Sequence, residues 1–322
     1  MLRSLIVLCV GLILLTSCGS VALPQPSITP AYTTTQEMPV TLVDQTPQGT
    51  STKPITATIR ALLKTPTPTI PHSPTSIPRT PTLTACMKAG GSVEVSEFTT
   101  ILLPNPMVYR IYLPPCYYEE PEQSYPVLYL IHGQTYSDTQ WDRLGVPETA
   151  DRLIAADDVA PFIVVMPRDR VWREPTEDNF GLAVEQSLIP WVDDHYRTIP
   201  DRAHRAIGGL SRGGAWAIHL GLSHPELFSA VGAHSGFVFY TDVQPLYLWL
   251  HNIPIGLAPR IYMDVANEDR PEIAESATFL EDLLTQYDIP HEWHMFVGEH
   301  EEAYWQVHVE DYLRWYTQDW NK

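Results

Sequence analysis

The sequence predicts an α/β fold for residues 86–322, with a mostly parallel sheet covered by helices on both faces. Short, continuous apolar runs rich in β-forming residues recur along this region, as is typical of strands buried on both faces of a sheet. Amphipathic stretches of helical length separate these runs. A repeated strand, helix, strand order favours parallel strands with helices above and below them, so both observations lead to the same fold class.

The predicted elements follow one another along the chain. Residues 126–131 read PVLYLI and residues 161–166 read PFIVVM, and similar runs give further strands at 205–210, 260–265 and 293–297. The amphipathic stretches predict helices at 147–157, 182–195, 213–223, 272–287 and 303–315. Because active groups gather at the carboxyl ends of the strands in such sheets, the residues that follow each strand are the candidates for a site.

Composition excludes several classes of protein. The chain has 322 residues and a formal net charge of -18, which argues against a nucleic-acid binder because phosphate recognition needs Lys and Arg. Hydrophobic residues make up 44% and aromatic residues 10%, enough for a core, so a collagenous or wholly disordered chain is excluded. Residues 1–85 hold five basic and two acidic side chains, which leaves 15 basic and 36 acidic ones for residues 86–322.

Residues 1–17 are interpreted as a signal peptide and not as a membrane span. The apolar run from Leu5 to Leu15 follows one basic residue and is shorter than the roughly 20 residues that a spanning helix needs. It ends in LTSC, which resembles the bacterial lipobox, so we expect Cys18 to be lipidated and to anchor an exported chain to a membrane. The alternative is an ordinary signal peptide with an incidental Cys18 and a freely secreted protein.

The composition of residues 18–85 predicts a disordered linker. Their Thr, Pro and Ser content, as in KTPTPTIPHSPTSIPRTPTLT, cannot bury enough apolar surface to offset the entropy of ordering. Of the four cysteines, Cys9 leaves with the signal peptide and Cys18 is expected to carry lipid. Cys86 and Cys116 then remain in a compartment that permits disulfides. We predict that these two form a disulfide, with two separate buried thiols as the alternative.

A serine follows the predicted strand at 205–210. The sequence RAIGGLSRGGAWAIHL places the motif G-x-S-x-G between a strand and a helix. Gly209 and Gly213 let strand and helix pass close to a tight turn that exposes the hydroxyl of Ser211, so we predict Ser211 as a nucleophile. The backbone N–H of Arg212, at the helix start, is predicted to face a developing oxyanion. The alternative for Ser211 is a structural turn serine.

The segment LIPWVDDHYRTIPDRAHRAIGGLSRGGAWAIHLGLSHPELFSAVGAHSG resembles the esterase D or enterochelin esterase-like group of α/β-hydrolases. This group includes feruloyl and acetylxylan esterases, siderophore esterases, S-formylglutathione hydrolases and mycolyltransferases. The similarity extends from about Val108 to Tyr316, and its most specific parts are IHG, GGLSRGG, SHPELF and the final His loop. The resemblance implies an α/β-hydrolase esterase domain at 86–322, with the backbone N–H of Gln134 as the second oxyanion donor.

A serine nucleophile needs a base, and the base needs a carboxylate that fixes its tautomer; in this fold they follow in the order Ser, acid, His. The family pattern of strand, Gly, two residues and Asp falls on Asp269, with Ala266 where Gly is usual, and Glu268 is the alternative acid. Asp264 lies within a predicted strand and is interpreted as a structural carboxylate. The family pattern G-x-H-x-x-x-x-W falls on His300, which we predict as the base.

Several residues are candidates to bind the substrate. Arg168 and Arg170 follow a predicted strand and suit an anionic acyl or leaving group, with a surface salt-bridge cluster as the alternative. Trp141 and Trp305 are candidate walls for an aromatic acyl group or a sugar ring, with core positions as the alternative. The apolar and aromatic residues 237–255 form either a lid over the site or a segment packed on the sheet.

No metal site is predicted. His291 and His294 are three residues apart on a strand, so they face opposite sides of the sheet. His300 and His308 lack the four-residue helical spacing of a zinc motif. The predicted chemistry needs no cofactor.

Two functions follow from these residues. The first is an exported, lipid-anchored serine esterase that acts on a small-molecule or glycan-linked ester, such as a sugar-linked acyl, feruloyl, acetyl or siderophore ester. The same Ser, His and Asp would also serve acyl transfer. The second is a non-catalytic lipoprotein that keeps the hydrolase fold and binds a glycan or a siderophore.

Overall fold

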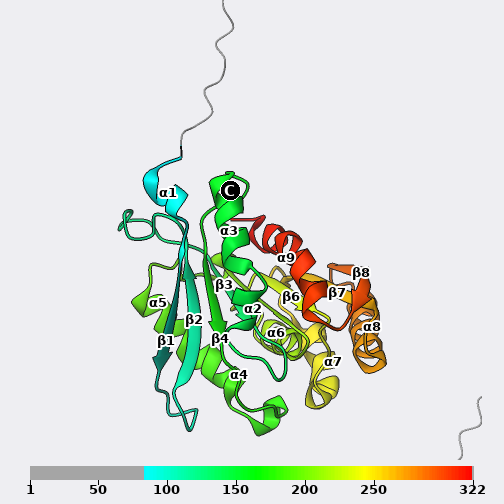
Figure 1. The fold of residues 1–322 in the computed structure, drawn as a ribbon. Helices are drawn as coiled ribbons and strands as arrows, with labels where there is room; N and C mark the ends of the chain where they lie inside the picture. The colour runs from blue at the N-terminus through cyan, green and yellow to red at the C-terminus, as the bar shows by residue number, and fades with distance from the viewer. Residues whose placement is uncertain (1–82, 321–322) are drawn as a thin grey trace, which may run out of the picture. The chain divides into compact units, whose positions relative to one another are not determined.

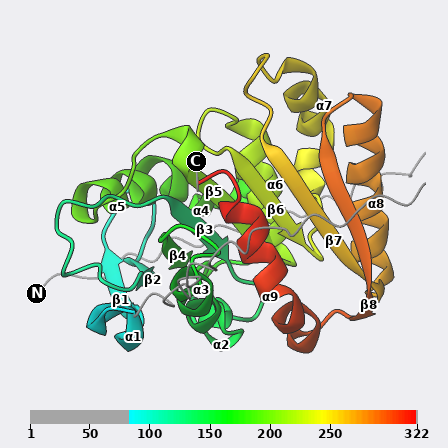
Figure 2. The same cartoon turned by 90° about the horizontal axis from the view of Figure 1, so that it is seen from above.

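The computed structural model describes residues 83–320, and Figures 1 and 2 show how their helices and strands are arranged. The predicted signal peptide (1–17), the lipidation site Cys18 and the linker (18–85) up to residue 82 lie outside the described residues. No helix between residues 83 and 320 is long and apolar enough to cross a membrane.

One sheet of eight strands forms the centre of the described region. The strands are β1 (Ser92–Phe98), β2 (Met107–Leu113), β3 (Val127–Ile131), β4 (Ile163–Pro167), β5 (Arg205–Leu210), β6 (Ala230–His234), β7 (Arg260–Glu268) and β8 (His291–Glu299). Their order across the sheet is β1-β2-β4-β3-β5-β6-β7-β8. Strand β2 runs antiparallel to both of its neighbours, β1 and β4, and every other pair of neighbours is parallel.

Helices cover both faces of this sheet (Figure 2). They are α1 (Ala85–Ala89), α2 (Gln140–Arg143), α3 (Val146–Ala155), α4 (Phe180–Ala183), α5 (Ile189–His195), α6 (Arg212–Ser223), α7 (Val243–Asn252), α8 (Pro271–Gln286) and α9 (Glu302–Thr317). Alternate residues of β3 face opposite layers, as the period of a strand requires. Leu128 and Leu130 pack with α3 and α9, whereas Val127, Tyr129 and Ile131 pack with α5 and α6.

A tyrosine fills the space between α9 and the middle of the sheet. Tyr316 is buried, and its hydroxyl lies where side chains on β5 and β6 would otherwise be. A Cβ placed on Gly208 or on Gly232 would stand 1.8 Å from that hydroxyl oxygen. Both positions therefore need glycine, and this need shapes the sequence of β6, which reads AVGAH.

The mostly parallel sheet with helices on both faces confirms the predicted fold class. The five predicted strands correspond to β3, β4, β5, β7 and β8, and the predicted helices correspond to α3, the α4–α5 region, α6, α8 and α9. Strands β1, β2 and β6 were not predicted from the sequence. Strand β6 reads AVGAH and has only one β-branched residue, and its Gly232 makes room for Tyr316.

A disulfide joins Cys86 in α1 to Cys116, which follows β2. The Cα atoms of the two residues are 5.0 Å apart, and 30 positions of sequence separate them. The predicted pairing is therefore present. A second tie lies nearby, because the carboxylate of Asp151 in α3 accepts hydrogen bonds from the N–H of Gly91 (2.8 Å) and the hydroxyl of Tyr112 (2.7 Å). Together these contacts fix the start of the domain.

We expect the double substitution Cys86→Ser and Cys116→Ser to lower the free energy of unfolding by about 2 to 4 kcal/mol, because the unfolded chain gains the freedom of the opened loop. Urea unfolding of the wild type and of the variant measures the difference. Reduction of the wild type should give the same loss. An unfolding midpoint that stays constant on reduction would contradict this expectation.

Candidate active site

Ser211 lies in a strained turn between β5 and α6. Its φ is 52° and its ψ is -119°, a backbone conformation that residues other than glycine rarely adopt. The turn is also tight: a Cβ on Gly209 would lie 2.2 Å from the carbonyl carbon of Gly213, and one on Gly213 would lie 2.0 Å from the oxygen of Ile131. The N–H of Ser211 donates to the carbonyl of His234 at 2.8 Å. These contacts hold the serine at the carboxyl end of the sheet.

Ser211, His300 and Asp269 form one chain of hydrogen bonds. His300 Nε2 lies 2.9 Å from the hydroxyl oxygen of Ser211, and His300 Nδ1 lies 2.7 Å from Oδ1 of Asp269. Asp269 follows β7 and His300 follows β8, so neighbouring strands bring them together. The side chain of Asp269 is fully buried, whereas Glu268, the alternative acid, is exposed. The structure thus unites the three residues that the motifs single out.

The carboxylate of Asp269 has further partners. Its Oδ1 accepts the N–H of Arg270 at 2.8 Å. The hydroxyl of Ser235 donates to the same carboxylate and accepts the indole N–H of Trp305 at 3.3 Å. Burial raises the pKa of Asp269, but hydrogen bonds from His300 and Ser235 outweigh it and hold the pKa below its ordinary value. Asp269 is therefore ionised and oriented toward the ring of His300.

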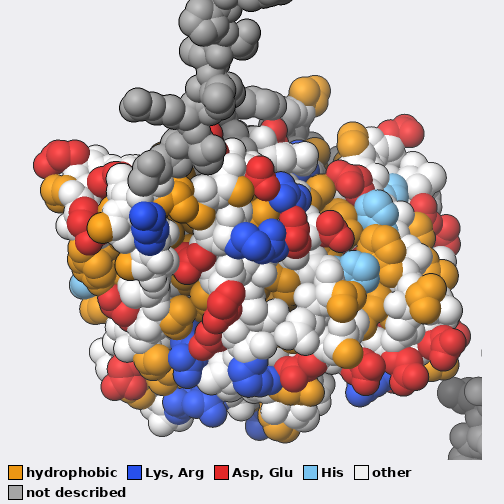
Figure 3. Space-filling view, turned by 45° about the horizontal axis from the view of Figure 1, so that its top comes forward, with side chains coloured by type: hydrophobic (Ala, Val, Ile, Leu, Met, Phe, Trp, Pro, Cys, Tyr) orange, Lys and Arg blue, Asp and Glu red, His pale blue; other side chains and the backbone are white. Residues whose placement is uncertain are grey.

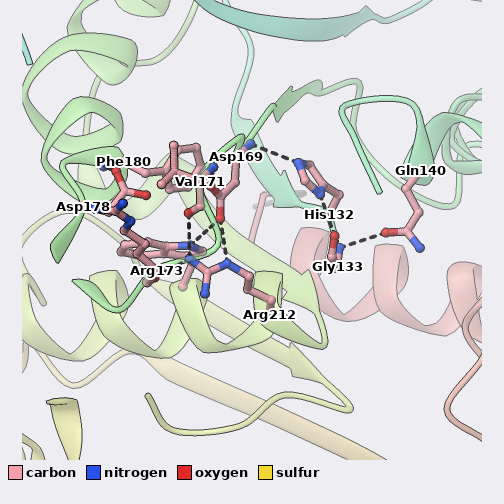
Figure 4. Close-up of polar contacts among 10 residues, drawn as sticks. His132, Gly133, Gln140, Asp169, Val171, Arg173, Asp178, Phe180 and Arg212 are labelled. Carbon is pink, nitrogen blue, oxygen red and sulfur yellow. Dashed lines mark hydrogen bonds and ion pairs between the residues drawn. The ribbon is translucent and has the colours of Figure 1, made fainter. Parts of the chain in front are cut away.

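The loop after β3 is held from two sides (Figure 4). On one side, the N–H of Gly133 donates to Oε1 of Gln140 at 2.8 Å, and the amide nitrogen of Gln140 donates to Glu302 at 3.1 Å. On the other side, Nδ1 of His132 lies 2.8 Å from the carbonyl oxygen of Gly133. His132 Nε2 accepts the N–H of Asp169 at 3.0 Å, so the ring proton is on Nδ1 and is donated to Gly133.

This hydrogen bond fixes the direction of the next N–H. The carbonyl of Gly133 and the N–H of Gln134 belong to one planar trans peptide, so they point in opposite directions. Gln134 lines the same cavity as Ser211. Burial lowers the pKa of His132, which favours the neutral ring that this arrangement requires.

The side chain of Arg212, the residue after Ser211, is buried, and Figure 4 shows it directed toward Asp169. Its Nε donates to Asp169 at 2.8 Å, and a terminal nitrogen donates to the carbonyls of Val171, at 3.2 Å, and Arg173. Asp169 also accepts the indole N–H of Trp216 at 3.0 Å. As the first residue of α6, Arg212 has a backbone N–H without a carbonyl partner within the helix.

A cavity of about 510 Å³ opens at Ser211. Its size is typical of sites for small molecules. The loop after β3, the turn at Ser211, the segment after β6 and the start of α8 supply its walls. The residues that line it include Gln134, Tyr136, Ser211, Phe237, His300 and Trp305.

The structure corrects part of the predicted substrate contacts. Trp305 lines the cavity, and its ring meets that of His300 edge-on at 5.0 Å. Trp141 is a core residue instead: it is buried, its indole N–H donates to the carbonyl of Ile131 at 3.0 Å, and it does not line the cavity. Arg168 and Arg170 are outside the cavity walls as well, on the exposed loop after β4, where Arg168 lies 3.9 Å from Asp138.

Residues 237–255 divide into two parts. Phe237 and Val238 line the cavity, so the beginning of the segment contributes to the site. The rest contains α7, whose buried Leu246 and Leu250 pack with residues of α6 and α8. Most of the segment is therefore packed on the domain, which was one of the two alternatives, and only its first residues contact the site.

Four residues that hold the site were not identified from the sequence: His132, Gln140, Asp169 and Ser235. His132 belongs to the IHG motif. This motif located the loop after β3, but it did not indicate that the ring of His132 binds the carbonyl of Gly133. Asp169 lies between Arg168 and Arg170 after a predicted strand, and no local pattern indicates that its carboxylate binds Arg212 and Trp216. Ser235 follows β6, a strand that the sequence did not predict. Gln140 is seven residues from its partner Gly133, a spacing that carries no local signal.

Asp264 is part of a buried polar cluster beside the site. It accepts His234 Nδ1 at 2.6 Å and the hydroxyls of Tyr304 (2.7 Å) and Tyr312 (3.0 Å). Tyr316 contacts the other ring nitrogen of His234 at 3.0 Å. These contacts agree with a structural role for Asp264. Among residues 83–320, no three His, Cys, Asp or Glu side chains are grouped closely enough to hold a metal ion.

Comparison with known proteins identifies the family. The model of the family described as putative esterase matches residues 102–316, a range that contains the whole hydrogen-bonded chain of Ser211, Asp269 and His300. The chain belongs to the putative esterase family. By class this esterase is a carboxylic-ester hydrolase.

Individual relatives of the esterase support the fold. A segment of 129 residues is 34% identical to an endo-1,4-beta-xylanase/feruloyl esterase of Xylanibacter ruminicola, covering 38% of this chain and only 18% of that relative. A solved ferulic acid esterase has a TM-score of 0.64 at 23% identity, covering 71% of this chain and 98% of that chain. An S-formylglutathione hydrolase from Staphylococcus aureus has a TM-score of 0.58 at 15% identity, covering 70% and 96%. The predicted α/β-hydrolase fold is thereby confirmed.

We expect the stability that the Asp269 carboxylate gives this esterase to depend on pH. Its pKa is lowered by folding, so its contribution is complete above the ordinary value of 3.8 and is lost as the pH falls through the folded value. Near neutral pH, Asp269→Asn should therefore unfold at lower urea concentration than the wild type, and the difference should shrink below pH 3.8.

The exposed neighbour Glu268 provides the matched control, because Glu268→Gln should change the unfolding midpoint little at any pH. A difference between wild type and Asp269→Asn that stays constant over the acid range would rule out this account of the carboxylate.

Proposed function

We propose that this chain is an exported, lipid-anchored serine esterase that hydrolyses a glycan-linked carboxylic ester. The observation that carries the mechanism is the chain of hydrogen bonds from Ser211 through His300 to Asp269, with Ser211 and His300 lining the cavity. No metal or cofactor takes part in the proposed steps.

In the first step the hydroxyl oxygen of Ser211 attacks the ester carbonyl while His300 Nε2 takes its proton. The carbonyl oxygen becomes an oxyanion, and the negative charge of Asp269 stabilises the imidazolium. Collapse of this intermediate breaks the bond to the alcohol, which leaves with the proton from His300. Water then attacks the acyl-enzyme by the same route and releases the acid and Ser211.

The oxyanion would accept hydrogen bonds from the backbone N–H groups of Gln134 and Arg212. Arg212 offers the first N–H of α6, at the positive end of the helix. The peptide of Gln134 is held by His132, and the Nε2 of His132 is held by the N–H of Asp169. Because the carboxylate of Asp169 also binds the Arg212 side chain, one buried residue connects both proposed donors.

Two observations support an aromatic or small acyl group, and the xylanase in the name of the sequence relative supports a glycan as the alcohol part. A relative by sequence and a solved neighbour are named as feruloyl and ferulic acid esterases. The cavity at Ser211 has the aromatic side chains of Tyr136, Phe237 and Trp305 in its wall, which suits an aromatic or small acyl group.

The proposed location rests on the N-terminal sequence and on the disulfide. Residues 1–17 have the pattern of a signal peptide and Cys18 follows a lipobox-like sequence. The bond between Cys86 and Cys116 supports an exported protein, since such bonds persist mainly in oxidising compartments.

We expect Ser211→Ala to lower kcat for nitrophenyl acetate by at least about 10³-fold, because the variant lacks the attacking oxygen. A fluorophosphonate should label the wild type and leave Ser211→Ala unlabelled. Steady-state kinetics and intact-mass spectrometry measure the two effects. Ser276 is a matched control, since it lines the same cavity, and Ser276→Ala should still be labelled.

The result also separates the competing functions. If the wild type neither hydrolyses the ester nor takes up the label, the proposed mechanism is wrong and a binding module with this fold replaces it. If an added sugar alcohol becomes acetylated in preference to the release of acetate, acyl transfer replaces hydrolysis.

We expect His132→Leu to lower kcat by about 10- to 100-fold with little change in KM, because the peptide of Gln134 loses the hydrogen bond that directs its N–H. The full loss of one oxyanion donor typically costs about 10²- to 10³-fold, which sets the upper limit. His132→Asn should recover much of the rate, since an amide N–H can replace the donor at Nδ1.

His219→Leu tests for a general effect of removing a partly buried histidine, because His219 pairs with Asp242 outside the cavity walls. Equal rates in the Leu and Asn variants of His132, at equal thermal stability, would show that the hydrogen bond to Gly133 has no role in the reaction.

A further inference from the structure

Exposed aromatic side chains concentrate at the carboxyl edge of the sheet. Among residues 83–320, four Phe, Tyr or Trp side chains are exposed: Tyr118 (64%), Tyr136 (41%), Trp172 (51%) and Tyr240 (86%). Tyr118 follows β2, but the other three are on the loops after β3, β4 and β6. In a parallel sheet these loops lie at the edge that holds Ser211. Exposed aromatic side chains that lie together at such a place are candidates for a binding surface.

The loop that carries Trp172 lies directly beside the nucleophile turn. The side chain of Arg212, the residue after Ser211, donates to the carbonyls of Val171 and Arg173, which flank Trp172 on both sides. One arginine side chain therefore links the backbone on both sides of Trp172 to the turn at Ser211.

The segment with Tyr240 adjoins the same loop. The N–H and hydroxyl of Thr241 donate to Glu174 at 3.2 and 3.3 Å. The guanidinium carbon of Arg212 lies 5.1 Å from the ring centroid of Phe239. Phe239 in turn packs against Phe237, which lines the cavity. Trp172 and Tyr240 thus belong to one surface that continues outward from the cavity.

This surface also carries unpaired positive charge. Arg170 and Arg173 are exposed, and within residues 83–320 neither side chain forms an ion pair. Their setting is acidic: residues 86–322 hold 36 acidic side chains and 15 basic ones, and Figure 3 shows acidic groups over much of one face with Lys and Arg in small groups among them. In an acidic domain, two arginines left without carboxylate partners are available to a carboxylate from outside.

The loop is held rigidly although its tip is exposed. Asp169 is buried and accepts hydrogen bonds from Arg212, Trp216 and the N–H of Val171. A buried ion pair contributes little to net stability but fixes geometry where every partner is satisfied. The side chains of Arg170, Trp172 and Arg173 are therefore presented from a fixed backbone, which reduces the entropy lost when a ligand binds.

We propose that Arg170, Trp172, Arg173 and Tyr240 form a subsite for a carboxylate-bearing sugar, a uronate, in the alcohol part of the ester substrate. The C–H face of a sugar ring packs on the aromatic faces of Trp172 and Tyr240. The uronate carboxylate accepts hydrogen bonds from the arginines, whose planar groups match its geometry. This inference rests on the proposed function, since it places the sugar of a glycan-linked ester outside the acyl cavity.

Direct binding tests the subsite without requiring catalysis. The full chain with Ser211→Ala is titrated calorimetrically with hexagalacturonate, an anionic oligosaccharide, and with xylohexaose, a neutral one. Hexagalacturonate should bind more tightly, and salt should weaken its binding. Adding Arg170→Ala and Arg173→Ala should reduce its affinity about tenfold or more, and Trp172→Ala should reduce the affinity for both sugars.

Matched controls lie elsewhere on the domain. Tyr118→Ala removes an exposed aromatic ring and Arg152→Ala removes an exposed arginine of α3, and neither should change the affinity. In the background with Ser211 intact, Tyr118→Ala and Arg152→Ala should hydrolyse nitrophenyl acetate at the wild-type rate. Failure of the esterase mechanism would appear in that assay, separately from failure of the subsite.

Three results would overturn the inference. In the first, hexagalacturonate does not bind. In the second, it binds equally well to the variant that lacks both Arg170 and Arg173. In the third case xylohexaose binds as tightly as hexagalacturonate and responds only to Trp172→Ala, which would make the surface a platform for neutral sugars.

Discussion

The positive φ of Ser211 is the constraint on which the rest of the site depends. Such a backbone conformation costs about 1 to 3 kcal/mol and persists only where the surroundings enforce it. Here Gly213 packs against Ile131 on one side, and the N–H of Ser211 is bound by the carbonyl of His234 on the other. His234 is in turn fixed by the buried carboxylate of Asp264. The hydroxyl of Ser211, which lines the cavity, is thus supported by several layers of packed core.

Three buried carboxylates each hold one part of the site in position. Asp169 follows β4, Asp264 lies in β7 and Asp269 follows β7, and each accepts hydrogen bonds from several donors. A buried carboxylate is tolerated only when its lone pairs are satisfied in this way. Asp169 holds the loop beside Arg212, Asp264 holds the strand under the turn and Asp269 orients His300. Most acidic side chains are on the surface, but these three buried carboxylates hold the residues around the site in position.

The sequence predicted the parts of the fold whose signal is local. Buried strands with bulky apolar runs, such as β3 and β4, were identified, and the G-x-S-x-G turn located Ser211 because its glycines and flanking elements are adjacent in sequence. Strand β6 was missed because it is short and rich in Gly and Ala, and its Gly232 makes room for a tyrosine on α9 that is more than 80 positions away. The local sequence pattern of β6 contains no information about its contact with Tyr316.

The same distinction applies to the site. His300 and Asp269 were found by family patterns, which summarise three-dimensional information that a single sequence lacks. His132 and Gln140 act through backbone groups of Gly133, and such contacts leave no mark on residue spacing. Trp141 was a candidate for the cavity wall because it follows the loop at Gly133, with a core position as the alternative. Its buried indole bond to Ile131 shows that the ring belongs to the core.

The packing of Tyr316 has a consequence for how this sequence can change over evolutionary time. Its hydroxyl occupies the space of two missing Cβ atoms, on Gly208 and Gly232, so neither glycine can become alanine while the tyrosine stays. The tyrosine in turn contacts His234, whose carbonyl holds the turn at Ser211. A smaller residue at position 316 would leave a hole beneath the nucleophile, which only coordinated replacement of the glycines could fill. Substitutions at these positions should therefore be correlated among homologues.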